Sequence, residues 1–565
     1  MSSRLRRCTS RSATTRAAFA LQHVRQFSPR AFRLPPAPIR SARPKRAIWD
    51  IYRPSIIQFL LLASVTAAAL PKTAARHLLP PAPPDVQRCD LLIRPDIATG
   101  RLRLTATLDI DNPPGNREFT FLLAPWYDTV VVRSRFGPAT MTREGDVVTV
   151  VVSRSRPHEQ LVFRLSGTPG QSAGDERPVL ADSSIYLLWS DRFYPVDFDD
   201  WAVVSTTLEV PRGFRVLAPG RQVLAEDRGG VHVERYQTAE PIRAATVIAD
   251  ARWVQTERTI GGKRMRTLLY PASRAYADQL FRTSADVLDF YTSHFGRYAF
   301  DEFTFATVDG IFARRAVAGG VIYNPGYLAE ELRTTGHDAH ETALLWWFYT
   351  LAGRGPGSYQ WTEGFGDYAE ILYDEARGLP VPADFEAYRR GYLNMAGTPA
   401  EPPITAPRGP LAGNFIHGRL PWVMHLLRFA VGDSAFNRGV RLLFDRWRFR
   451  SFTLEEFAAT LAEGTGQPLD WWRDEWLKRG GVPELTWHAD ITPDSSGYRV
   501  AVSLRQAGVL YHLPLEIGIE SSLGLRVERV YLDGPTGDFR FWSAAAPLRV
   551  LVDPHRWLLA RITAE

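Results

Sequence analysis

The hydrophobic period changes twice along the 565 residues of this chain. From about residue 89 to residue 258, apolar and polar residues alternate in short runs such as Leu102–Ile110, which is typical of half-buried strands. Helical spacing begins at Ser273–Phe295, and alternating runs return from Leu485 onward. The sequence therefore predicts a multidomain α+β protein with an N-terminal all-β domain, a mainly helical domain and a small C-terminal β-sandwich.

Within the helical block, apolar residues recur at helical spacing in five further segments. We expect helices over Thr335–Leu351, Thr362–Arg377, Arg419–Ala430, Ala435–Arg446 and Thr453–Gly464. The segment Pro380–Pro410 is rich in Pro and Gly, which predicts a long loop over the helical domain.

Charge is distributed unevenly along the chain. Of the 68 Lys and Arg residues, 13 lie in residues 1–53 together with a single acid, Asp50, so the remainder carries 55 basic against 60 acidic side chains. The total of +7 is therefore no evidence for a nucleic-acid partner, and none is expected. Two cysteines, Cys8 and Cys89, exclude a disulfide framework and a four-cysteine zinc module.

The N-terminus is expected to direct the protein to a membrane or across it. Residues 1–53 form a basic leader that is predicted to be disordered, and the apolar run Ile56–Leu70 follows it. This run is shorter than the roughly 20 residues of a membrane span, so residues 54–71 are interpreted as a signal-peptide core and the protein as exported. An uncleaved membrane anchor through residues 56–70 and an organelle transit peptide are the alternatives. Residues 72–87 are a Pro-rich linker.

One constellation in the helical block indicates chemistry. His340 and Glu341 lie in a helical pattern that continues to Trp346 and Trp347, and the segment Trp361–Glu370 follows with Glu363, Gly364, Phe365 and Tyr368. This arrangement resembles the M1 aminopeptidases, a branch of the zincin metallopeptidases. Their signature is H-E-x-x-H, eighteen further residues, and a Glu in a W-x-x-E-G-F-x-x-Y-x-E context. Trp361 is displaced by one position from that pattern.

The resemblance implies a thermolysin-like, mainly helical peptidase domain. It places the N-terminal β domain at residues 88–258, the M1-like domain at 259–484 and the C-terminal β-sandwich at 485–565. It implies zinc ligands at His340 and Glu363, a general base at Glu341, and a role for Glu370 in supporting a ligand His. In a complete motif two His at i and i+4 and one Glu bind the metal, which leaves a fourth position open for water.

The motif is incomplete in this chain because Leu344 stands where the second His is expected. A Leu cannot bind a metal, and two ligands rarely hold zinc, so a zinc cofactor is doubtful. His337 or Asp338 could replace the lost ligand only if the metal moved or the start of the helix unwound.

Two further roles implied by the resemblance are also missing. The stretch that matches the family's amine-binding segment keeps Gly319 and Gly320, expected in substrate binding, but has no Glu. The oxyanion-stabilising Tyr of the family is matched by Phe415, which has no hydroxyl to donate, and one missing oxyanion donor costs roughly 10²–10³ in rate.

Three losses at three roles favour one function over the others. We expect an exported, inactive or impaired metallopeptidase homologue that binds a peptide or protein ligand in the old cleft. The alternatives are an active zinc metallopeptidase with a substitute ligand such as His337, and an architectural domain in which the cleft has no role.

Overall fold

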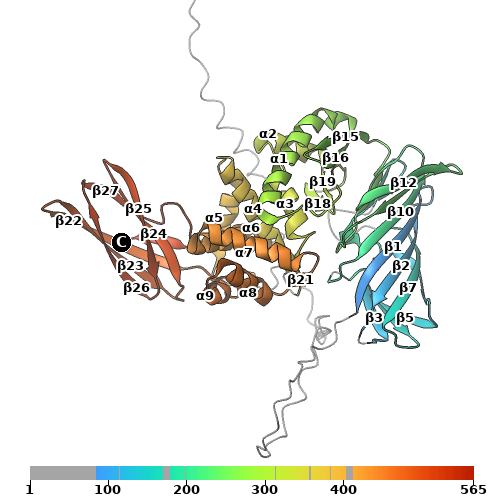
Figure 1. Ribbon diagram of the computed structural model, residues 1–565, viewed down its shortest axis with the longest axis horizontal. Coiled ribbons are helices and arrows are strands. Elements are labelled where there is room, and N and C mark those ends of the chain that lie inside the picture. Colours follow the sequence, from blue (N-terminus) through green and yellow to red (C-terminus); the bar gives the residue numbers. More distant parts are fainter. Residues whose placement is uncertain are drawn as a thin grey trace, which may run out of the picture. The chain divides into compact units, whose positions relative to one another are not determined.

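The computed structural model describes residues 84–565, with the exception of 114, 170–178, 198, 312, 356–357, 382 and 403–410 (Figure 1). The predicted leader, the apolar segment 54–71 and most of the linker 72–87 lie outside these residues. The described residues belong to one compact unit. None of the described helices combines the length and the apolar character that crossing a membrane requires.

A seven-stranded sheet forms most of the N-terminal β domain. Its order is β12 (Arg221–Arg228), β13 (Val231–Gln237), β10 (Val203–Pro211), β1 (Asp85–Asp96), β2 (Arg101–Asp111), β7 (His158–Gly167) and β4 (Tyr127–Ser134). Every second residue of β2 from Leu102 to Ile110 is buried, as the alternation of the sequence predicts. The inward face of the sheet is therefore apolar, and the other face is polar.

Two smaller sheets complete this domain. One has the order β3 (Glu118–Leu122), β6 (Val147–Val152) and β5 (Ala139–Glu144); the other has β11 (Arg215–Leu217), β14 (Val247–Asp250), β9 (Ser184–Leu187) and β8 (Val179–Ala181). Phe121 of β3 meets Phe163 of β7 edge to face at 5.5 Å, so residues of two sheets share one core.

A five-stranded sheet precedes the helices. Its order is β15 (Val254–Ile260), β16 (Lys263–Leu269), β17 (Glu302–Thr307), β19 (Gly320–Tyr323) and β18 (Arg314–Val317). The central strands β16, β17 and β19 are parallel, and the outer strands β15 and β18 pair antiparallel. The predicted domain boundary at 258/259 falls inside β15, because this strand continues into a hairpin with β16. The edge position of β18 is important for the site.

The helices follow in chain order. They are α1 (Ala277–Phe295), α2 (Pro325–Thr334), α3 (Ala339–Trp347), α4 (Ser358–Ala376), α5 (Ala383–Met395), α6 (Ala412–Val431), α7 (Asp433–Trp447), α8 (Leu454–Thr465) and the short α9 (Asp470–Trp472). The two-residue strands β20 (Ala352–Gly353) and β21 (Ser451–Phe452) pair between them.

The structure corrects two sequence predictions in this part. The predicted loop 380–410 contains α5, whose Phe385 and Tyr392 are buried seven residues apart on one helical face, so the helical period outweighs the local Pro and Gly content. The helix expected from Thr335 begins at Ala339, because the Thr335 hydroxyl donates to the His337 carbonyl at 3.1 Å and shapes a turn there.

Two sheets form the C-terminal β-sandwich, which confirms the predicted fold class. They have the orders β26 (Thr536–Ser543), β23 (Gly497–Ala507), β22 (Glu484–Asp494), β28 (Arg561–Ala564) and β25 (Gly524–Leu532), β24 (Leu513–Ser521), β27 (Pro547–Val552). Apolar residues of both sheets, such as Val502 and Leu515, are buried in the common core.

Helix α3 lies at the centre of the helical part. All nine of its residues are buried, and it packs against α4 and β18. A helix that is buried on every side has no solvent to hydrate its polar residues, so each of them needs a partner in the protein.

Candidate functional site

The two retained ligand positions lie on neighbouring helices. His340 is in the first turn of α3 and Glu363 in the first half of α4, and His340 Nε2 lies 3.3 Å from Glu363 Oε1. Ligand atoms at about 2.1 Å from a tetrahedral zinc ion lie roughly 3.4 Å apart. The pair therefore has the spacing of two zinc ligands, and equally that of a direct ion pair.

Leu344 occupies the position of the missing ligand, one turn further along α3. It is only 6% exposed, and a Cβ added to Gly366 of α4 would lie 2.7 Å from Leu344 Cδ2. The glycine thus leaves room for the leucine side chain between the helices. An apolar contact fills the place where a third metal-binding atom would be needed.

The sequence analysis missed Asp367 and His417, which join His340 in the core. Asp367 Oδ1 lies 2.9 Å from His340 Nδ1, and Asp367 Oδ2 lies 2.8 Å from His417 Nδ1 on α6. Glu370, the expected support of a ligand His, lies farther away, at 3.9 Å from His340 Nδ1. We call Glu363, His340, Asp367 and His417 the His340 chain.

The carboxylates control the charge of this chain. Burial favours a neutral imidazole, but Asp367 and Glu363 outweigh that effect and raise the pKa of His340 well above its ordinary value. Burial alone would raise the pKa of Asp367, but His417 and His340 hold it below the ordinary value. A carboxylate oxygen lies within 3.3 Å of each ring nitrogen of His340, so the positive charge of the protonated ring matches its surroundings.

Glu341, the residual general-base position, is held by an arginine. Glu341 Oε1 lies 3.4 Å from Arg314 Nε on β18, and the same guanidinium pairs with Glu331 of α2. Burial raises the pKa of Glu341, although His340 and Arg314 act in the opposite direction. This carboxylate is an ion-pair partner of Arg314, and its role as a general base stays a prediction.

A cavity of about 120 Å³ lies beside these residues. Its charged walls are Arg314 and Arg315 of β18 together with Glu341 and Glu363. The remaining lining residues are Trp189, Ala316, Leu344, Phe348 and Tyr349. The cavity thus combines an edge strand, aromatic rings and charges of both signs.

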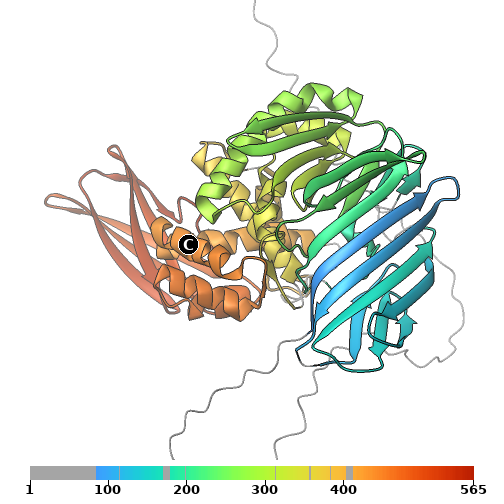
Figure 2. The ribbon, with the colours of Figure 1, turned by 45° about the vertical axis from the view of Figure 1, so that its right-hand side comes forward.

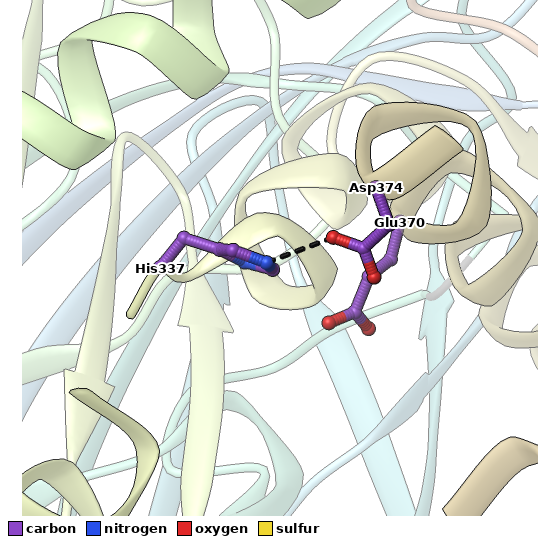
Figure 3. A group of neighbouring side chains, drawn as sticks. All are labelled: His337, Glu370 and Asp374. Atoms are coloured by element: carbon purple, nitrogen blue, oxygen red, sulfur yellow. Dashed lines mark ion pairs between the residues drawn. The ribbon is translucent and has the colours of Figure 1, made fainter. Parts of the chain in front are cut away.

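His337 belongs to a second polar group, which we call the His337 cluster. His337 Nε2 lies 2.8 Å from Asp374 Oδ1, and Glu370 lies beside them (Figure 3). Among the described residues, these three form the one group of three metal-type side chains whose ligand atoms lie within 4.8 Å of one another. His337 is therefore directed to the second half of α4, away from a position as third ligand with His340 and Glu363.

The contacts of His337 argue against a metal in this cluster. The backbone N–H of Ala339 donates to His337 Nδ1 at 3.3 Å, so Nε2 is the remaining ligand atom, and it already lies 2.8 Å from Asp374 Oδ1. A metal would need the lone pair of that same Nε2. At the site that the resemblance implies, His340 and Glu363 have no third ligand because Leu344 fills its place, so the residues present do not fit a catalytic zinc ion there.

The other predicted residues have backbone or packing roles in the structure. A Cβ on Gly320 would lie 2.1 Å from the Thr304 carbonyl oxygen, so β17 and β19 need this glycine, and Gly319 has φ of +84° in the preceding turn. Phe415 is fully buried against Tyr392, with ring centres 6.0 Å apart. None of the three lines the cavity, and their substrate roles stay predictions.

A sequence signal for Asp367 was present. Glu363, Asp367, Glu370 and Asp374 follow one another at i, i+4, i+7 and i+11, which places four carboxylates on one face of α4. Such a stripe on a predicted buried helix calls for cationic or donor partners on the facing element, and His337 and His340 provide them. His417 had no such signal, because its partner is fixed only by the packing of α6 on α4.

Known structures share this architecture. An M1 zinc metallopeptidase from Deinococcus radiodurans, a mutant bound to a Tyr-Ser-Ala substrate, superposes with a TM-score of 0.60 at 18% identity, covering 71% of this chain and 96% of that chain. Aminopeptidase A from Legionella pneumophila, in complex with aspartic acid, gives a TM-score of 0.70 at 13% identity over 85% of this chain and 60% of that chain.

Sequence comparison gives weaker relationships. Aminopeptidase N from Streptomyces lividans is 26% identical over 183 residues, which is 30% of this chain and only 20% of that relative's length. The chain matches no protein-family profile. At these identities the likeness concerns the fold, and it confirms the resemblance that the motif indicated: the chain has the fold of the M1 zinc metallopeptidases.

Proposed function

We propose that this protein binds peptides in the cavity beside β18 and does not hydrolyse them by zinc chemistry. The observation that carries the proposal is Leu344, which packs against Gly366 and leaves His340 and Glu363 as two ligand positions without a third. A catalytic zinc normally has three protein ligands and an open position for water.

The His340 chain supports a role without metal. Asp367 and Glu363 meet the two ring nitrogens of His340, at 2.9 Å and 3.3 Å. A protonated imidazole between two carboxylates supplies positive charge where the resemblance implies a metal. The helices α3 and α4 are thereby linked without a cofactor.

The edge strand β18 supports a peptide as the ligand. β18 pairs with β19 on one side only, and its residues Arg314, Arg315 and Ala316 line the cavity. An extended peptide adds to such an edge through main-chain hydrogen bonds, while wall residues select its side chains. The solved structures of similar fold contain a peptide substrate or an amino acid, which agrees with this class of ligand.

Metal content and peptide binding test the proposal together. The purified full chain is dialysed against a zinc-containing buffer, and its zinc content is measured by elemental mass spectrometry. A labelled peptide library is then screened for peptides that the chain binds and for peptides that it cleaves. We expect peptide binding without cleavage and no zinc that depends on Glu363.

Two variants serve as matched controls. Leu344→His completes the H-E-x-x-H pattern and is expected to gain about one zinc per chain, because three ligands then converge. Glu363→Gln in that background should lose it again. If the native chain already holds one zinc that Glu363→Gln removes, and cleaves peptides, the protein is an active metallopeptidase and the proposal is wrong.

Export is a separate proposal, supported by the basic leader and the apolar run Ile56–Leu70. We infer that the described part acts outside the cytoplasm, either released or held at a membrane through residues 56–70. Fractionation of cells that carry the full chain, with N-terminal sequencing of the mature protein, distinguishes cleavage, anchoring and organelle import.

A further inference from the structure

Several loops lie together at one end of the seven-stranded sheet. The register pairs Asp85 at the start of β1 with Asp111 at the end of β2, and Asp111 with His158 at the start of β7. Ser134 at the end of β4 lies opposite Leu161 of β7, so β4 ends on the same side. The loops 112–117, 135–138 and 153–157 therefore meet at the end where β1 begins (Figure 2).

Hydrogen bonds fix these loops to one another. Asn112 is fully buried, and its side-chain amide donates to the carbonyls of Asn116 at 2.9 Å and Arg156 at 2.8 Å. The backbone N–H of Ser153 donates to the Pro138 carbonyl at 3.0 Å. A buried and satisfied amide ties the loops into a defined surface rather than leaving them independent. We call this surface, without residue 114, the arginine tip.

The arginine tip carries four arginines and one exposed aromatic ring, that of Phe136. Arg117, Arg135 and Arg154 are exposed and Arg156 is half-buried. Phe136 is 42% exposed, and the guanidinium groups of Arg135 and Arg156 lie 5.8 Å and 5.3 Å from its ring centre.

Acidic partners are absent around these four arginines in the part of the chain that the structure describes. Among the residues that the structure describes, none of the four has a carboxylate oxygen within 4.0 Å, whereas Arg94 pairs with Glu209 at 2.8 Å.

Three acids lie near the arginine tip without pairing with its arginines. Asp111 pairs with His158 at 3.0 Å, and the buried Glu159 accepts from the Ser134 hydroxyl at 2.8 Å. The exposed Glu118 follows Arg117 in the chain.

Asp85 approaches Asp200 at the start of β1, and β1 is separated from β4 by three strand spacings, about 14 Å. Among the described residues, the arginine tip thus presents four guanidinium groups that no carboxylate neutralises, two of them beside an exposed aromatic ring. Guanidinium groups bind phosphate through paired hydrogen bonds, and an exposed aromatic ring beside them suits the apolar layer below the phosphates.

The position of the tip in the chain points to the same partner. β1 begins at Asp85, and only 14 residues separate it from Leu70, the end of the apolar run in which we predict a signal or anchor. Fourteen residues span at most roughly 50 Å. We propose that the arginine tip docks on the phospholipid headgroups of an anionic membrane surface, with Phe136 entering the interface. This inference concerns a different face from the peptide cavity and goes beyond the proposed function.

A fluorescent probe at the tip tests the proposal in the full chain. Phe136→Cys is labelled with an environment-sensitive dye in a Cys8→Ser background, since Cys89 is buried and does not compete. Leu523→Cys, at a residue that is 76% exposed in the C-terminal domain, is the matched control. With vesicles of phosphatidylcholine and phosphatidylglycerol in equal amounts, we expect a blue shift at position 136 and none at position 523.

Substitutions that remove positive charge distinguish membrane binding by the arginine tip from membrane binding by the basic leader, residues 1–53. Arg135→Gln, Arg154→Gln and Arg156→Gln together should weaken the vesicle dependence of the shift by about a hundredfold, since each arginine near an anionic surface contributes about fivefold. The control triple Arg446→Gln, Arg473→Gln and Arg526→Gln removes arginines that already pair with acids and should leave it unchanged.

Several results would overturn the proposal. A shift that persists in the tip triple, or that appears equally at position 523, would show that the leader alone carries the membrane contact. No shift with any vesicle while an acidic protein produces one would assign the tip to a protein partner instead. Each result leaves the peptide-binding proposal untouched, because that depends on the cavity beside β18.

Discussion

His337 and His340 lie three residues apart, and both face carboxylates of α4, yet their surroundings differ. The His340 chain runs from Glu363, which lines a cavity, to His417, whose side chain is 25% exposed. The His337 cluster has no such outlet: the side chains of His337 and Asp374 are 5% and 2% exposed. The first group reaches the cavity and the solvent, whereas the side chains of His337 and Asp374 are enclosed.

The two halves of the carboxylate stripe on α4 therefore have different expected roles. Four carboxylates on one helix face are costly unless each has a partner. The half of α4 near its start keeps its carboxylates close to a cavity, where they can take part in binding. The half near its end uses the same residue types to hold the start of α3 in place, and we expect stability effects without binding effects there.

The largest effect is expected from Asp367→Ala. Both His340 and His417 then lose the carboxylate they share. The buried His340 keeps only Glu363 at 3.3 Å, and the half-buried His417 loses the partner of its Nδ1. We expect a loss of about 5 kcal/mol in the free energy of unfolding, at the upper end for a broken buried pair, and weaker peptide binding. Urea unfolding and peptide titration measure the two effects. Unchanged peptide affinity in a folded variant would separate the His340 chain from the cavity.

Asp374→Ala makes the corresponding change in the His337 cluster. His337 loses its only partner among the described ion pairs, so we expect a loss of about 3–4 kcal/mol in unfolding free energy. Peptide affinity should stay at the native value, because the cluster lies away from the cavity. An affinity loss similar to that of Asp367→Ala would contradict the division between the two groups.

The sequence predicted the sheets and helices well where the hydrophobic period was long and uniform, as in β2 and α7. It failed at α5, where Pro and Gly content outweighed a correct helical period, and it did not predict the five-stranded sheet, whose parallel strands β16, β17 and β19 are buried and short. At the site, spacing located His340, Glu341 and Glu363. Asp367 and His417 come together only because α6 packs on α4. The spacing of residues in the sequence does not predict that packing.

Glu370→Gln should make the protein more stable above neutral pH. Burial raises the pKa of Glu370 to about 7, so the folded state keeps this carboxyl protonated while the unfolded state loses its proton near pH 4.5. The native chain therefore loses up to about 3 kcal/mol as pH rises from 4.5 to 7, and the uncharged Gln removes that loss. Urea unfolding at pH 5 and pH 8 measures it; a gain at both pH values would indicate a cause other than titration.

Gly366→Ala is expected to have the smallest effect on the free energy of unfolding. It tests the contact between Gly366 and Leu344, the residue that stands in place of a metal ligand. The new Cβ would approach Leu344 Cδ2 to 2.7 Å, so the leucine must move, at a cost of about 1–2 kcal/mol. In a Leu344→Ala background the clash is gone, and the same substitution should cost only a few tenths of a kcal/mol, as a double-mutant cycle in urea would show. Equal costs in both backgrounds would mean that Gly366 is required by backbone packing rather than by Leu344. A difference between them would show that Gly366 is needed only where Leu344 fills the space between the helices.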